Sequence, residues 1–194
     1  MRLCLGLLFS IAFVACQNSS APVPKPHQYP RVDFPQRQYS LFTDNDCSLA
    51  FEIPTYSFVE KKSTYFNEKP LHPCWFDVVY QEFNGRLHCS YFDLTSREVL
   101  DELIDDAFDL VSKHHSKASF AKESIIENQD VDGLLFDIQG PVASPLLFFV
   151  TDSTTHFFMG SLYFNNKVNP DSMQIIHDFV REDVLHLIET FEWR

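Results

Sequence analysis

Three side chains that could support nucleophilic catalysis lie close together in the sequence, at Asp152, Ser153 and His156. In a serine hydrolase the imidazole removes the hydroxyl proton and the carboxylate orients the imidazole. The members of such a site normally come from separate elements, and the segment lacks the Gly-x-Ser-x-Gly pattern. Asp, Ser and Thr between two apolar segments are also typical of a hairpin turn. We favour the turn and keep a periplasmic hydrolase as an alternative.

The other histidines do not predict a metal site. His114 and His115 are neighbours on a predicted helix, so their side chains point in different directions, and we expect them to complement the helix C-terminus. His177 and His186 lie on opposite faces of a second predicted helix and cannot share a metal ion. The sequence has no zinc motif, phosphate loop or dinucleotide fingerprint. We therefore predict neither a metal nor a cofactor.

Acidic residues on the two predicted helices could provide paired carboxylates for acid–base catalysis. Most of them fall between the apolar positions of the helical pattern, which favours a solvent-exposed face over a catalytic pair. They are Asp101, Glu102, Asp105, Asp106, Glu182 and Asp183.

Cys16 follows a short apolar N-terminus and is predicted to carry a lipid anchor. One positive charge at Arg2 precedes the apolar run Leu3 to Phe13, which is too short to span a bilayer, and the small residue Ala15 directly precedes Cys16. This is the pattern of a bacterial lipoprotein signal peptide, with acyl chains such as palmitate on the cysteine. An ordinary signal peptide that happens to contain Cys16 is the alternative, and both place the protein outside the cytoplasm.

The segment after Cys16 is predicted to be an extended spacer. Prolines at positions 22, 24, 26, 30 and 35 favour polyproline II and exclude a helix. No acidic residue occurs in Gln17 to Val23, which favours a domain facing the periplasm rather than the cell exterior. The predicted organisation is a signal peptide over 1–15, a lipid-anchored spacer over 16–40 and one domain over 41–194.

Composition limits the partners of this domain. The formal net charge is −12, so the protein repels nucleic-acid phosphates and anionic headgroups. We expect contact with the membrane only through the anchor at Cys16. Twenty Phe against 5 Gly predict a dense aromatic core in a single domain.

Three cysteines remain after the predicted processing, at Cys47, Cys74 and Cys89. In an oxidising compartment two of them are expected to pair. Cys47 and Cys74 each begin an apolar segment, whereas Cys89 lies inside a predicted strand. We favour a Cys47–Cys74 disulfide, and the two pairings through Cys89 stay open.

Hydrophobic periodicity predicts an α+β fold. The last two predicted strands are apolar on both faces, so both faces of the sheet must be covered. We predict an antiparallel β-sheet meander between two long helices, a sandwich-like arrangement. A hairpin is indicated by Asn84-Gly85. The predicted strands are 47–53, 74–80, 86–92, 118–126, 131–139, 145–152 and 156–165, and the predicted helices are 96–115, capped through Thr95 and Glu98, and 171–191, capped by Asn169.

Several segments resemble one protein family, the gliding motility lipoprotein GldD family, and do so in the same order along the chain. The most specific are Phe148 to Phe158, Gly160 to Asn165 and the C-terminal Leu187 to Trp193. The other matching segments are Tyr29–Pro35, Cys47 with Phe51-Glu52, His72–Phe76 and Asn169–Ser172. The predicted fold also resembles PsbP-like domains, by analogy only.

The family resemblance implies a lipoprotein of the cell envelope in bacteria with gliding machinery and the linked type IX secretion system. It implies no catalytic residues. Our main hypothesis is a non-enzymatic accessory or assembly component whose partners are envelope proteins of that machinery. A solute- or lipid-binding lipoprotein is the first alternative, and it would be favoured by a cavity larger than about 300 Å³. The hydrolase at Asp152, Ser153 and His156 is the second.

Overall fold

A computed structural model of the protein describes residues 31–44, 47–61, 64, 69, 72–114, 118–129, 131–165 and 170–194. The chain divides into two compact units, Met1–Asp33 and Phe34–Arg194. Cys16 and the N-terminal part of the predicted spacer therefore lie outside the described residues. The second unit begins at Phe34, so the end of the predicted spacer belongs to the folded unit.

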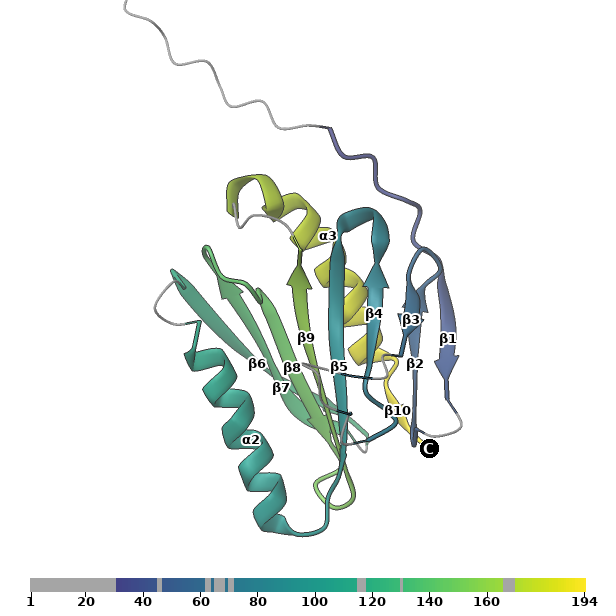
Figure 1. Ribbon diagram of the computed structural model, residues 1–194, viewed down its shortest axis with the longest axis vertical. Coiled ribbons are helices and arrows are strands. Elements are labelled where there is room, and N and C mark those ends of the chain that lie inside the picture. Colours follow the sequence, from purple (N-terminus) through teal and green to yellow (C-terminus); the bar gives the residue numbers. More distant parts are fainter. Residues whose placement is uncertain are drawn as a thin grey trace, which may run out of the picture. The chain divides into compact units, whose positions relative to one another are not determined.

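The second unit is built around a seven-stranded antiparallel sheet (Figure 1). The four strands that come last in the sequence of this sheet are also neighbours in space, which confirms the predicted meander. The strand that precedes the first helix pairs with the last of these four strands. The spatial order is β3 (Phe58–Glu60), β4 (Phe76–Tyr80), β5 (Gly85–Asp93), β9 (His156–Phe164), β8 (Leu146–Thr151), β7 (Val131–Gln139) and β6 (Phe120–Asn128).

A second, three-stranded sheet was not predicted. It consists of β1 (Tyr39–Thr43), β2 (Leu49–Pro54) and β10 (Glu192–Trp193), with β2 in the centre. Strands β3 and β10 escaped prediction because runs of three and two residues are too short for an alternation pattern, and β1 begins inside the predicted spacer. Strand β10 brings the C-terminal residues next to β2, far from it in sequence.

The hairpin predicted at Asn84-Gly85 joins β4 and β5. A short 3₁₀ helix, η1 (Gln81–Phe83), makes the turn, and Asn84 adopts a left-handed conformation with φ 52°. Asn tolerates this conformation better than most residues do. Gly85 is already the first residue of β5, so the turn lies slightly earlier than a two-residue loop would place it.

One face of the seven-stranded sheet packs against α2 (Arg97–Ser112). The helix residues Leu100, Ala107 and Val111 form one buried cluster with Phe149 and Phe157 of the sheet. The N-cap is Ser96, whose hydroxyl accepts the backbone N–H of Val99, one residue later than the predicted cap at Thr95. The helix also ends earlier than position 115.

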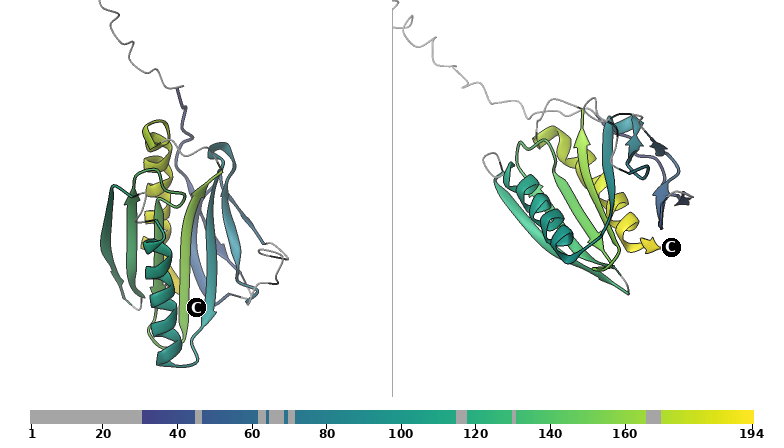
Figure 2. Two further views of the ribbon diagram at one scale, coloured as in Figure 1. Left: turned by 60° about the vertical axis from the view of Figure 1, so that its left-hand side comes forward. Right: turned by 60° about the horizontal axis from the view of Figure 1, so that its bottom comes forward.

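Helix α3 (Pro170–Glu189) and the three-stranded sheet cover the opposite face (Figures 1 and 2). Aromatic rings fill the space between them, which confirms the predicted aromatic core. The rings of Phe51 and Phe158 are 6.0 Å apart, and Phe191 follows the end of α3 and lies 5.3 Å from Phe158. The predicted cap Asn169 lies outside the described residues. The sheet between two helices confirms the predicted α+β architecture.

Candidate functional site

The Asp152 side chain organises the turn between β8 and β9. Its Oδ1 accepts backbone N–H groups of Thr154, Thr155 and His156 at 2.9, 2.7 and 2.9 Å. Burial by itself raises the pKa of Asp152, but these three donors outweigh it and hold the pKa below its usual value. Ser153 adopts a left-handed conformation with φ 63°. The segment is thus a hairpin turn, as predicted.

The imidazole of His156 faces side chains other than Ser153. Its Nδ1 is hydrogen-bonded to Tyr91 Oη, its Nε2 lies 4.0 Å from Asp152 Oδ2, and its ring stacks on Trp193 at 5.1 Å. Asp152 and His156 therefore come together, whereas Ser153 takes no part in their contacts. The geometry needed for nucleophile activation, a hydroxyl bonded to the imidazole, is not formed by these three residues.

Further side chains extend this contact into a polar network that we call the hairpin-end cluster, made of His72, Tyr91, Asp93, Asp152 and His156. Tyr91 Oη donates to Asp93 Oδ1 at 3.2 Å, and His72 Nε2 lies 3.5 Å from Asp93 Oδ2. Burial and the Asp93 carboxylate raise the pKa of Tyr91 to about 12. Tyr91 therefore remains a neutral hydroxyl that links the two histidines.

A disulfide between Cys47 and Cys74 lies beside this cluster. The Cα atoms are 5.5 Å apart, and both residues are buried. His72 Nδ1 accepts the backbone N–H of Cys74 at 3.1 Å, which connects the bridge to the cluster. Cys89 is a buried free thiol, and burial raises its pKa well above the usual value. Low thiolate content and poor access make Cys89 unreactive.

Asp183 was predicted on a solvent-exposed face, and this prediction is wrong. Its side chain is completely buried and accepts hydrogen bonds from Arg37 Nε at 3.2 Å, Tyr39 Oη at 3.1 Å and Tyr56 Oη at 2.5 Å. Burial raises the pKa of Asp183 more than its three donors lower it. We call Asp183, Arg37, Tyr39 and Tyr56 the Asp183 clamp, because their hydrogen bonds join α3 to the N-terminal part of the folded unit. In contrast, Glu182 is exposed, as expected.

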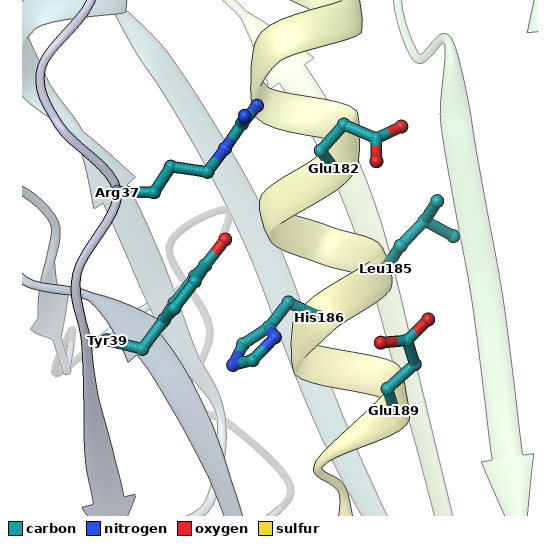
Figure 3. Close-up of a pocket in the computed structure, with 6 residues that line it drawn as sticks. All are labelled: Arg37, Tyr39, Glu182, Leu185, His186 and Glu189. Carbon is teal, nitrogen blue, oxygen red and sulfur yellow. The ribbon is translucent and has the colours of Figure 1, made fainter.

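A shallow pocket of about 210 Å³ lies next to the clamp (Figure 3). Arg37 and Tyr39 approach α3 from one side, and the helix contributes the other lining residues: Glu182, Leu185, His186 and Glu189. The His186 ring stacks on Tyr39 at 3.7 Å, and its Nε2 lies 2.6 Å from Glu52 Oε2. This volume is below the roughly 300 Å³ at which typical small-molecule sites begin. The pocket therefore gives no support to solute binding.

A polar row across four neighbouring strands was missed in the sequence. Glu60, Asp77, His88 and Ser161 lie directly opposite one another on β3, β4, β5 and β9. The fully buried Asp77 accepts from His88 Nδ1 at 2.6 Å and from Arg86 Nη1 at 3.1 Å. A carboxylate-oriented imidazole can transfer protons. Ser161 Oγ, however, is buried without a hydrogen-bond partner, so no substrate can reach it in this conformation.

The remaining histidines have local structural contacts. His177 is buried on α3, where burial lowers its pKa, and its Nδ1 lies 3.4 Å from Asp178. Burial also lowers the pKa of His114, just after α2, and His115 lies outside the described residues. Within the part of the chain that the structure describes, no three His, Cys, Asp or Glu residues are grouped to hold a metal ion. The same residues contain no helix that is long and apolar enough to cross a membrane.

Comparisons with known proteins complement this geometry. No curated protein matches the chain. Among solved structures, the solution structure of cyanobacterial PsbP (CyanoP) from Synechocystis sp. PCC 6803 is similar with a TM-score of 0.47 and 10% identity over 85% of this chain and 98% of that chain. This likeness is too distant to inform function.

The family comparison covers the segments from which the hairpin-end cluster, the disulfide and the Asp183 clamp are built. The model of the family described as "Gliding motility lipoprotein GldD" matches residues 19–193. The match confirms the family resemblance of the sequence. Because it spans nearly the whole chain, this protein belongs to the gliding motility lipoprotein GldD family.

Proposed function

We propose that the protein is a lipid-anchored, non-enzymatic accessory or assembly component of the gliding machinery and of the type IX secretion system linked to it. The family match over residues 19–193 carries this proposal. Its partners are then envelope proteins of the machinery, and its activity is binding rather than turnover.

The side chains that could support chemistry favour this proposal, because they have structural contacts among the described residues. Asp152 accepts three backbone donors of its own turn. His156 is held between Tyr91 and Trp193. The imidazole of His88 is oriented by the Asp77 carboxylate, but the neighbouring hydroxyl, that of Ser161, is buried. None of these arrangements combines an accessible nucleophile with a base in hydrogen-bond contact.

Membership of a lipoprotein family implies a membrane-anchored location in the cell envelope. We propose that Cys16 carries the lipid and that the folded unit faces the periplasm. The disulfide between Cys47 and Cys74 supports an oxidising compartment outside the cytoplasm.

Replacing Cys16 by serine should abolish lipid attachment, because serine cannot form the thioether through which the acyl-bearing group is attached. We expect the variant to accumulate as precursor and to lose label when cells are grown with a radioactive fatty acid. Cys4→Ser is the matched control, since it changes a cysteine within the apolar run and should leave processing and label intact. Normal label on the Cys16→Ser protein would refute lipid attachment at this residue.

The catalytic-looking residues should be dispensable for function. Asp152→Asn, Ser153→Ala and His156→Gln, each expressed in a gliding strain whose own family member is deleted, should restore most of the gliding and secretion. A catalytic residue would instead cost several orders of magnitude in rate. Immunoblots must show normal amounts of each variant. A normally abundant variant that fails to restore either activity would favour the hydrolase over the accessory component.

A further inference from the structure

Strand β6 forms a long open edge of the seven-stranded sheet (Figures 1 and 2). It has nine residues, whereas β3 at the opposite edge has three. All nine residues of β6 pair with β7 without interruption, and no other strand among the described residues pairs with its outer side. The outward-facing backbone N–H and C=O groups of β6 can therefore bind another strand.

Natural proteins usually block such edges with charged side chains, proline, a β-bulge or a very short strand. Strand β6 contains no proline and no bulge, and charge at Lys122, Glu123 and Glu127 is its only protection of this kind. Two of its apolar side chains are open, because Ile125 is 80% exposed and Phe120 is 56% exposed, whereas Ile126 is buried. Charge on β6 disfavours unspecific association, but the backbone of the edge stays open to a strand whose charges complement it.

The two faces of β6 follow from its contacts. Ala121 packs against the cluster under α2, so Glu123, Ile125 and Glu127 lie on the same face by the two-residue period. Asn128 Nδ2 reaches the backbone carbonyl of Glu189 on α3, which places the alternate residues on the other face. A strand added to β6 would meet acidic, apolar and acidic side chains in turn on the α2 face.

Helix α2 adds negative charge on this face. Phe108 contacts Phe136 on β7, the neighbour of β6, and Asp105 lies about one turn before Phe108 on the same side of α2. The outer surface of α2 bears six exposed carboxylates, of Glu98, Asp101, Glu102, Asp105, Asp106 and Asp109. This field attracts a positively charged segment and repels an acidic one, including a second copy of this protein with its net charge of −12.

We propose that β6 binds an extended segment of a partner protein by β-strand addition, and that this segment carries basic, apolar and basic residues at alternate positions. Backbone hydrogen bonds to β6 supply affinity, and pairing of the basic residues with Glu123 and Glu127 around Ile125 supplies selectivity. The inference adds a binding surface to the proposed function and can fail without affecting it.

A synthetic peptide tests this proposal directly. The probe is a nine-residue peptide with the central pattern Lys-Thr-Val-Thr-Lys, added to the isotope-labelled protein with its disulfide intact. We expect saturable NMR shift changes in the backbone amides of β6. The same peptide with the backbone nitrogens of its five central residues all methylated keeps the charge but cannot donate hydrogen bonds along either edge, so it should not bind. Equal binding of both peptides, or shift changes confined to other elements, would overturn the proposal.

A charge exchange tests the selectivity. Glu123→Lys with Glu127→Lys should weaken binding of the basic peptide about tenfold or more, since two attractive cross-strand pairs become repulsive. The variant should bind the peptide with Glu-Thr-Val-Thr-Glu at its centre more tightly than the wild type does, although the carboxylates of α2 still repel this peptide. Glu82→Lys with Glu192→Lys is the matched control, because both residues are exposed and lie on η1 and β10 rather than on β6 or its neighbours, and it should leave binding within about twofold. Loss of binding in the control, or no recovery with the acidic peptide, would contradict the assignment to β6.

Discussion

Replacing Cys47 and Cys74 together by alanine should lower the free energy of unfolding by about 3 to 4 kcal/mol. The cysteines are 27 residues apart, and their bridge restricts the unfolded chain over that loop. For a domain of this size the loss corresponds to a decrease in melting temperature of roughly 10 °C. The bridge joins the segment before β2 to the segment before β4, so it links the two sheets covalently.

Calorimetry with and without a thiol reductant measures this effect. Reduction of the wild-type protein should lower its melting temperature to near that of the double variant, and should leave the double variant unchanged. Cys89→Ala serves as the control and should keep the sensitivity to reductant. Mass spectrometry of non-reduced peptides identifies the bridge itself. A bridge through Cys89, or three free thiols, would contradict the pairing of Cys47 with Cys74.

Asp183→Ala is expected to lower the free energy of unfolding by about 3 kcal/mol at neutral pH. The substitution leaves the hydroxyls of Tyr39 and Tyr56 and the guanidinium of Arg37 without their shared acceptor. Two of these donors, Arg37 and Tyr39, come from the N-terminal part of the folded unit, so their attachment to α3 should loosen. Urea unfolding measures the stability, and amide hydrogen exchange should show faster opening of β1.

Glu182→Ala is the matched control for this prediction. It removes a neighbouring carboxylate on the same helix that is 57% exposed, so it should change stability by no more than about 0.5 kcal/mol. Equal effects of Asp183→Ala and Glu182→Ala would show that the clamp does not stabilise the fold.

The same carboxyl group should make stability depend on pH. Because the folded-state pKa of Asp183 is raised, the folded state holds its proton more tightly than the unfolded state does. Its contribution to stability is therefore greatest below the unfolded pKa of about 4 and decreases as the pH rises to the folded pKa. Asp183→Asn, which does not titrate, should lack this decrease. Parallel pH profiles of the wild type and Asp183→Asn would contradict the raised pKa.

Local patterns were sufficient for the long elements of this protein. The last two strands of the large sheet, β8 and β9, are apolar on both faces, and both helices repeat their apolar residues every three to four positions. These periods depend only on neighbouring residues, because a side chain's face is set by its own backbone conformation. Asp152 could likewise be assigned to a turn, since its carboxylate bonds backbone groups two to four residues away.

The tertiary structure alone decided which polar residues meet. Asp183 has the helical position of a near-surface residue, yet donors from residues 37, 39 and 56 bury it. Asp77 and His88 come together only through the register of β4 and β5. Short strands such as β10 exist because a partner strand is already in place. Such contacts join distant segments, and their energies depend on a register and a burial that no local pattern encodes.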